Sequence, residues 1–147
     1  MVEASILVDS SIWIEALAPR APKEVVTILS ALLAAKRAAV SEMIQLEVLA
    51  GAKSHKELEQ FREDFASIHH LYVSAESWRQ AEEIGFALGR RGLHVPAADL
   101  LIAAVALSHD VSLWHADRDF ERIKQVMAGF KTYWFPQQYP PTRALVT

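Results

Sequence analysis

The stretch "SILVDSSIWIEAL", residues 5–17, decides the fold because its character changes within a few positions. Its first four residues are typical of the end of a buried β-strand, and its last six are typical of the start of a helix. Asp9 stands between them. An acid at this point can cap the helix, but Ser10 and Ser11 can do the same. The alternative is that Asp9 lies at the carboxyl end of a sheet strand, where open α/β sheets bind ligands.

The composition indicates one globular domain, which we expect to span residues 1–147. Of these residues, 52% are hydrophobic and 22% are charged. With 15 basic and 18 acidic residues the net charge is −3, so contact with nucleic acid would need local basic clusters. The chain has no cysteine, which excludes disulfides and thiolate metal sites. Acids interrupt the N-terminal apolar run, so we expect a cytoplasmic protein with no membrane segment.

Predicted strands alternate with predicted helices along the chain. Apolar residues at three- and four-residue spacing predict helices in "KEVVTILSALLAAK", "SEMIQLEVLAG", "KELEQFREDFASI", "AESWRQAEEIGFALGRRG", "PAADLLIAAVALSHD" and "RDFERIKQVM". Short apolar runs predict strands in "HLYV", "VSLWHA" and "KTYWF". Ser41 is expected as an N-cap, Gly51 and Gly92 as helix stops, and Pro96 as a helix start. The alternation predicts an α/β fold with a parallel sheet covered on both faces.

Acidic residues recur where these elements meet. Asp99 opens the most apolar helix, Asp117 follows the strand "SLWHA", and Asp119 comes two residues later. Glu47 lies inside "QLEVLAG", where its neighbours are apolar. A helix cap is the simpler explanation for Asp99 taken alone. In a parallel sheet, however, Asp9, Asp99 and Asp117 can converge at one rim.

Converging carboxylates need a counter-charge. Two of them about 4 Å apart repel by roughly 4 kcal/mol at an effective dielectric constant of 20. A set of three or four must therefore bind a cation or take up protons. Carboxylate oxygens favour Mg²⁺ or Mn²⁺, whereas the lack of cysteine and of a paired-histidine motif disfavours zinc. His115, two residues before Asp117, is a positioning group, a group that contacts a base, or a packed core residue.

Four segments of this chain, "ILVDSSIWIEAL", "QLEVLAG", "VPAADLLIAAVAL" and "HADRDFERI", resemble the signature segments of the PIN-domain nucleases. Their order and spacing are similar to those of the VapC toxins of VapBC toxin–antitoxin modules, over nearly the whole chain. The resemblance implies a PIN-like α/β/α sandwich, cleavage of RNA that depends on Mg²⁺ or Mn²⁺, neutralisation by a VapB-type antitoxin, and a homodimer.

The resemblance also implies a set of site residues. Matched position by position, the acidic set is Asp9, Glu47, Asp99 and Asp117, with Asp119 as a fifth member. Position 115 departs from the pattern, because many relatives have Thr or Ser where this chain has His.

These residues imply a hydrolytic mechanism. Asp9, Asp99 and Asp117 are expected to hold one or two divalent ions, while Glu47 orients or ligates from the facing helix. Water activated by the metal then attacks the phosphodiester in line. Ser10 and Ser11 are left to cap the helix behind Asp9, and we expect no covalent nucleophile.

Two other classes of function stay open. A receiver-like phosphoacceptor module also gathers acids around Mg²⁺, but it needs paired acids after the first strand and a Lys after the last. This chain has Ser10 and Pro136 at those places. The other class is a non-catalytic binding or regulatory protein on a PIN scaffold. Loss of an acid would mark such a protein, and none is lost here.

Overall fold

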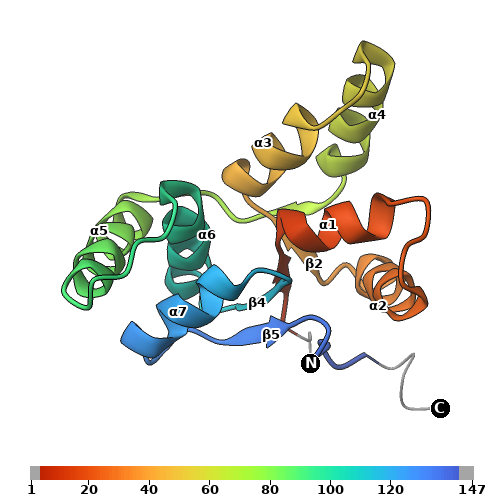
Figure 1. Cartoon of the computed structure of the whole chain (residues 1–147). Helices are drawn as coiled ribbons and strands as arrows, with labels where there is room; N and C mark the ends of the chain where they lie inside the picture. Colours follow the sequence, from red (N-terminus) through yellow and green to blue (C-terminus); the bar gives the residue numbers. More distant parts are fainter. Residues whose placement is uncertain (1–3, 143–147) are drawn as a thin grey trace.

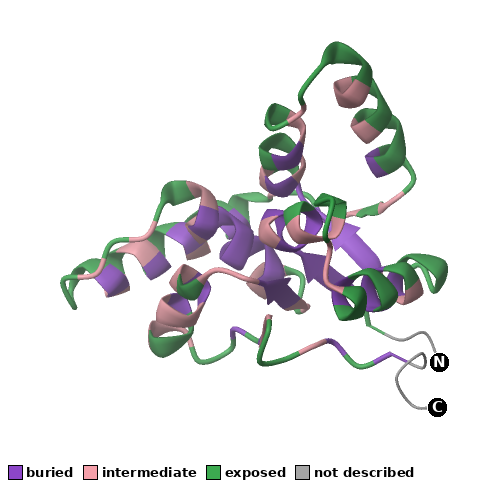
Figure 2. Ribbon diagram, turned by 45° about the vertical axis from the view of Figure 1, so that its right-hand side comes forward, coloured by how far each residue is buried: buried purple, intermediate pink, exposed green. Residues whose placement is uncertain are grey.

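The centre of the structure, a computed structural model that describes residues 4–142, is a parallel sheet (Figure 1). Its strand order is β3–β2–β1–β4–β5. The strands are β1 (Ile6–Val8), β2 (Ala38–Val40), β3 (His69–His70), β4 (Ser112–His115) and β5 (Thr132–Trp134). The sheet's three central strands, β1, β2 and β4, are almost entirely buried (Figure 2), as strands of parallel sheets generally are. Leu7 pairs with Ala39 on one side and Leu113 on the other, and all three are fully buried.

The helices within residues 4–142 form layers on the two faces of this sheet. They are α1 (Ser10–Leu17), α2 (Lys23–Ala34), α3 (Glu42–Ala50), α4 (His55–Ala66), α5 (Ala75–Gly89), α6 (Ala97–Ser108) and α7 (Arg118–Val126). Figure 1 shows α1 and α2 on one side and α6 and α7 on the other, as right-handed crossovers require. This confirms the predicted α/β sandwich. In the same range, no helix combines the length and the apolar character needed to cross a bilayer.

The pair α3 and α4 extends away from the rest of the fold, at the top of Figure 1. The outer face of α4 is exposed (Figure 2). The buried Phe65 lies on the inner face, where its ring packs edge-on against Trp13 of α1. The predicted limits of α3 are confirmed, because Ser41 is its N-cap residue and Gly51 its C-cap residue. The Ser41 hydroxyl, however, makes no capping hydrogen bond.

Strand β2 was absent from the sequence-based prediction. Its three residues, Ala38–Val40, include two alanines, which strands disfavour, and they are too few to show an alternating pattern. The segment is extended because it is buried between β1 and β3 and paired with both. Tertiary pairing therefore outweighs local preference here.

Two predicted boundaries were also wrong. The third strand lies at His69–His70 rather than in "HLYV" (70–73), because the chain leaves the sheet after Leu71 donates its N–H to the Val40 carbonyl. Helix α5 ends at Gly89 rather than at Gly92. Gly92 instead takes a left-handed conformation, with φ of 72°, in the turn that follows the helix.

Candidate functional site

Five carboxylates gather at the carboxyl edge of the sheet. Asp9 follows β1 directly and Asp117 follows β4 by two residues, and because β1 and β4 are paired in parallel, both reach the same edge. Glu47 comes from α3, Asp99 from the first turn of α6, and Asp119 from the first turn of α7. The structure therefore brings together the acids that the sequence suggested would converge.

Asp99 lies close enough to the other four acids for their negative charges to act on it. One oxygen each from Asp99, Asp117 and Asp119 lie within 4.8 Å of one another. The pKa of Asp99 is raised from 3.8 to about 7, first by burial and then by the negative charges of Asp117, Asp9, Glu47 and Asp119. Without a cation, the site therefore keeps a proton on Asp99 in part of the molecules at neutral pH.

Asp9 uses its two oxygens differently. It is 3% exposed, and its Oδ2 accepts hydrogen bonds from the backbone N–H and the hydroxyl of Ser11. Its Oδ1 is buried and accepts no hydrogen bond from any residue in the described range. Burial raises the pKa of Asp9 to about 6, against the bonds from Ser11 that lower it. One oxygen thus caps α1, and the other could bind a ligand.

The prediction that Ser10 and Ser11 cap α1 was wrong, because Asp9 is itself the N-cap residue. Asp9 has the extended backbone of a cap, whereas Ser10 is already the first helical residue. The Ser10 hydroxyl instead donates to Glu47 Oε1 at 3.0 Å. The Ser11 hydroxyl accepts the Ala116 N–H at 2.9 Å and so joins the ends of β1 and β4.

The cap explanation for Asp99 was also wrong. The N-cap residue of α6 is Pro96, and Asp99 is the third helical residue. Capping applies instead to Asp117, whose Oδ1 accepts the Asp119 N–H at 2.9 Å at the start of α7. Asp119 itself forms an ion pair with Arg122 at 3.0 Å.

His115 is fully buried, so the suggestion that it contacts a nucleotide base was wrong. Its Nδ1 accepts the Asp117 N–H at 3.1 Å, and its Nε2 lies 2.7 Å from Glu121 Oε2. Burial lowers the pKa of this histidine, against the raising effect of Glu121. Glu121 was not predicted as a site residue, and its signal in the sequence is its position one helical turn after Asp117.

The donor set fits a divalent cation. It consists of carboxylate oxygens, which hard ions such as Mg²⁺ and Mn²⁺ prefer. The unpartnered, buried Oδ1 of Asp9 and the negative charges around Asp99, which help to raise its pKa, both fit a site for a positive charge.

Residues 6–126 match the family described as PIN domain. The chain belongs to this family. The PIN domain is 30% identical over 131 residues to ribonuclease VapC18 of Mycobacterium tuberculosis, covering 86% of this chain and 92% of that protein. It is 35% identical over 128 residues to ribonuclease VapC11 of the same organism, covering 82% and 92%.

A solved structure resembles the same PIN domain. The crystal structure of VapBC2 from Rickettsia felis, bound to a DNA fragment from its promoter, matches with a TM-score of 0.72. The match covers 88% of this chain and 98% of that one at 19% identity, so it bears on the fold alone.

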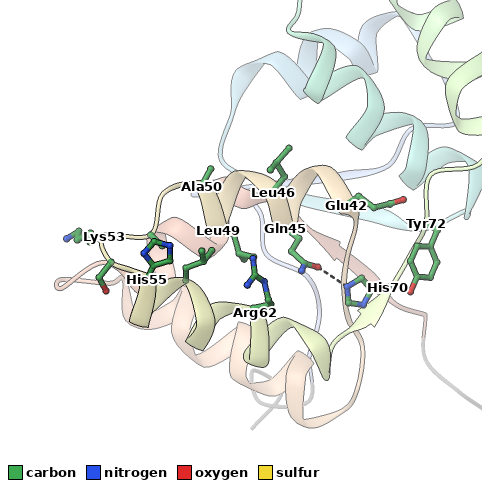
Figure 3. Close-up of a pocket in the computed structure, with 13 residues that line it drawn as sticks. Glu42, Gln45, Leu46, Leu49, Ala50, Lys53, His55, Arg62, His70 and Tyr72 are labelled. Atoms are coloured by element: carbon green, nitrogen blue, oxygen red, sulfur yellow. Dashed lines mark hydrogen bonds between the residues drawn. The ribbon is translucent and has the colours of Figure 1, made fainter.

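The PIN domain also has a groove of about 900 Å³ between α3 and α4, which none of the five acids lines. Its apolar lining includes Leu46, Leu49 and Leu58. Figure 3 shows Lys53 and Arg62 along the groove, with Gln45 hydrogen-bonded to His70 of β3. Leu46 is 60% exposed, so the groove presents apolar surface to solvent.

Proposed function

We propose that this PIN domain is a metal-dependent endoribonuclease that acts as the toxin of a toxin–antitoxin module. One observation carries the proposal: four carboxylates converge on the buried Asp99 at the carboxyl edge of a PIN-domain sheet. The names of its relatives, ribonucleases VapC18 and VapC11, support RNA as the substrate.

In this proposal, Asp9, Asp99 and Asp117 hold one or two Mg²⁺ or Mn²⁺ ions, and Glu47 and Asp119 complete the acidic site. When bound, the cation acidifies water for attack on the phosphodiester and offsets the negative charge of the reacting phosphate. The unpartnered Oδ1 of Asp9 supports its assignment as a ligand.

The protein's own residues prepare the site. Ser10 donates to Glu47 and fixes the carboxylate that reaches the site from α3. With its pKa raised to about 7, Asp99 would hold a proton in part of the molecules near neutral pH, and it would have to lose that proton to serve as a metal ligand.

The test is cleavage of total RNA by purified, antitoxin-free protein. We expect cleavage with Mg²⁺ or Mn²⁺ and none in EDTA. The matched variants are Asp117→Asn in the site and Glu83→Gln on the exposed face of α5, which remove the same charge. Only the first should abolish cleavage. Undiminished cleavage in EDTA, with trace metal excluded, contradicts the metal mechanism, and metal binding without any cleavage identifies a non-catalytic PIN protein.

For the partner, we propose that a VapB-type antitoxin binds in the groove between α3 and α4. Exposed apolar side chains such as Leu46 suit an amphipathic segment, and the neighbouring Lys53 and Arg62 suit acidic residues on it. Leu46→Asp should weaken co-purification with the antitoxin encoded beside this protein, whereas Leu33→Asp on α2 should not. If Leu46→Asp instead changes only the mass of the free protein, the groove binds a second copy of the chain.

We also propose that the protein is a cytoplasmic homodimer. Two exposed aromatic side chains on α5, Trp78 and Phe86, support a contact between copies because aromatic residues are enriched at protein–protein interfaces. Light scattering of the purified protein should give the mass of two chains, and Trp78→Asp should reduce it to one.

A further inference from the structure

The ring of His115 is fully buried and is fixed by aromatic contacts and by hydrogen bonds at both nitrogens. It is 0% exposed, it stacks on Trp134 at 6.3 Å between ring centroids, and it packs against Phe120 at 5.0 Å. Both ring nitrogens have partners as well. A buried polar ring with a fixed orientation can act on its neighbours only through those two nitrogens.

The partners fix the tautomer of the ring. Because the Asp117 N–H donates to Nδ1, this nitrogen carries no hydrogen in the neutral ring. The hydrogen is therefore on Nε2, which donates to Glu121 Oε2 at 2.7 Å. The same oxygen of Glu121 accepts the hydroxyl of Thr132 at 2.8 Å. A chain of hydrogen bonds thus runs from β5 through α7 to the backbone of Asp117.

Asp117 is consequently held at two points. Its N–H is bound by His115, and its carboxylate Oδ1 accepts the Asp119 N–H at 2.9 Å. Together the two bonds fix where the carboxylate stands relative to Asp99 and Asp119, with which it shares the 4.8 Å cluster. Without the bond to Nδ1, the N–H of Asp117 loses its acceptor, and of these two bonds Asp117 keeps only the one at its carboxylate.

We propose that His115 is a positioning residue for the metal site, acting through Asp117, with Glu121 and Thr132 holding its ring in the required tautomer. This inference rests on the proposed function, in which Asp117 is a metal ligand. Groups that orient ligands in this way typically contribute 10- to 100-fold to metal affinity.

A set of three variants isolates the bond to Asp117. In an Asx turn, the side-chain oxygen of Asn or Asp accepts the backbone N–H two residues later. His115→Asn therefore keeps an acceptor for the Asp117 N–H and loses the bond to Glu121. His115→Gln has a longer side chain, which keeps a donor for Glu121 and moves the acceptor away from the Asp117 N–H. His115→Leu loses both bonds. All three remove the aromatic ring, so loss of packing is common to them.

The measurements are Mn²⁺ binding by calorimetry, thermal unfolding without metal, and RNA cleavage. Relative to wild type, His115→Leu and His115→Gln should weaken Mn²⁺ binding by about 10- to 100-fold, with a matching loss of cleavage. His115→Asn should retain most of the wild-type affinity for Mn²⁺, although its metal-free melting temperature is also lowered. If His115→Leu does not fold, the comparison of Gln with Asn carries the same information.

Two results overturn the proposal. The first is equal Mn²⁺ affinity in wild type and His115→Gln. The second is a set of affinities that ranks the variants by melting temperature and not by whether they keep an acceptor for the Asp117 N–H. Failure of the proposed function gives a different result. A wild-type protein that binds Mn²⁺ but cuts no RNA ends the nuclease assignment, while the order of Mn²⁺ affinities among the variants still tests the role of His115.

Discussion

Asp99 combines burial with the repulsion of four other acids, so it gains most from a bound cation. Asp99→Asn removes one repelling charge and no capping bond, so the metal-free protein should be as stable as wild type or more stable. Cleavage should nevertheless collapse. For wild type, Mg²⁺ at a hundredfold excess over its dissociation constant should add about 2.7 kcal/mol of stability.

Melting curves with and without Mg²⁺ check this prediction, together with a cleavage assay on the same samples. The Mg²⁺-induced increase in melting temperature should be much smaller in the variant than in wild type. A variant that keeps full cleavage and the full increase would show that Asp99 is not a ligand.

The raised pKa values of Asp9 and Asp99 predict that the metal-free protein loses stability as the pH rises. In the unfolded chain both carboxyls have the ordinary pKa of 3.8, whereas the folded values are about 6 and about 7. Between pH 4 and 7 the folded state therefore binds more protons, and the free energy of unfolding falls with increasing pH.

Each unit of pKa shift corresponds to about 1.4 kcal/mol, so the decline should be on the order of a few kcal/mol. Urea unfolding in EDTA at pH 5, 6, 7 and 8 measures it, and Asp99→Asn should show a shallower decline. Stability that increases over this range would mean that the pKa values of Asp9 and Asp99 are not raised in the folded protein.

Between elements, the Ser11 hydroxyl is the link that joins the start of α1 to the end of β4. Ser11→Ala leaves the Ala116 N–H without its acceptor and removes one donor from Asp9. We expect a loss of about 1–3 kcal/mol in the free energy of unfolding, the usual cost of an unpaired buried group. Ser11→Thr keeps the hydroxyl and serves as the control. Equal stability of wild type and Ser11→Ala in urea would contradict the importance of this link.

The sequence predicts elements well where their pattern is long or has an end signal. Helix α6 shows both, with a nearly continuous apolar run after Pro96. Strand β2 shows neither, and only its pairing with β1 and β3 makes it a strand. Four of the acids, Asp9, Asp99, Asp117 and Asp119, were found for a related reason: they stand at or near the ends of recognisable elements. The partners Glu121 and Thr132 were not, because contacts between a helix and a distant strand leave no local pattern.

At the scale of the whole molecule, the proposed toxin activity predicts growth arrest when the protein is expressed alone. Co-expression of the antitoxin encoded beside it should restore growth. Asp99→Asn should be harmless at the same protein level because the fold stays intact while the site is lost. Colony counts after induction, with immunoblots to match expression, provide the measurement. Toxicity that persists in this variant would mean that growth arrest does not come from the acidic site.

Asp9 is both the cap of α1 and a candidate ligand. This affects which mutations can abolish the toxicity of the protein without unfolding it. Among cells that survive induction of the protein, mutations to Ala at Asp9 and at Asp99 should both abolish toxicity and so allow growth equally well. They leave different products, because Asp9→Ala also removes two hydrogen bonds that begin the helix. Survivors sorted for a soluble, full-length product should therefore be rich in Asp99 alleles and poor in Asp9 alleles.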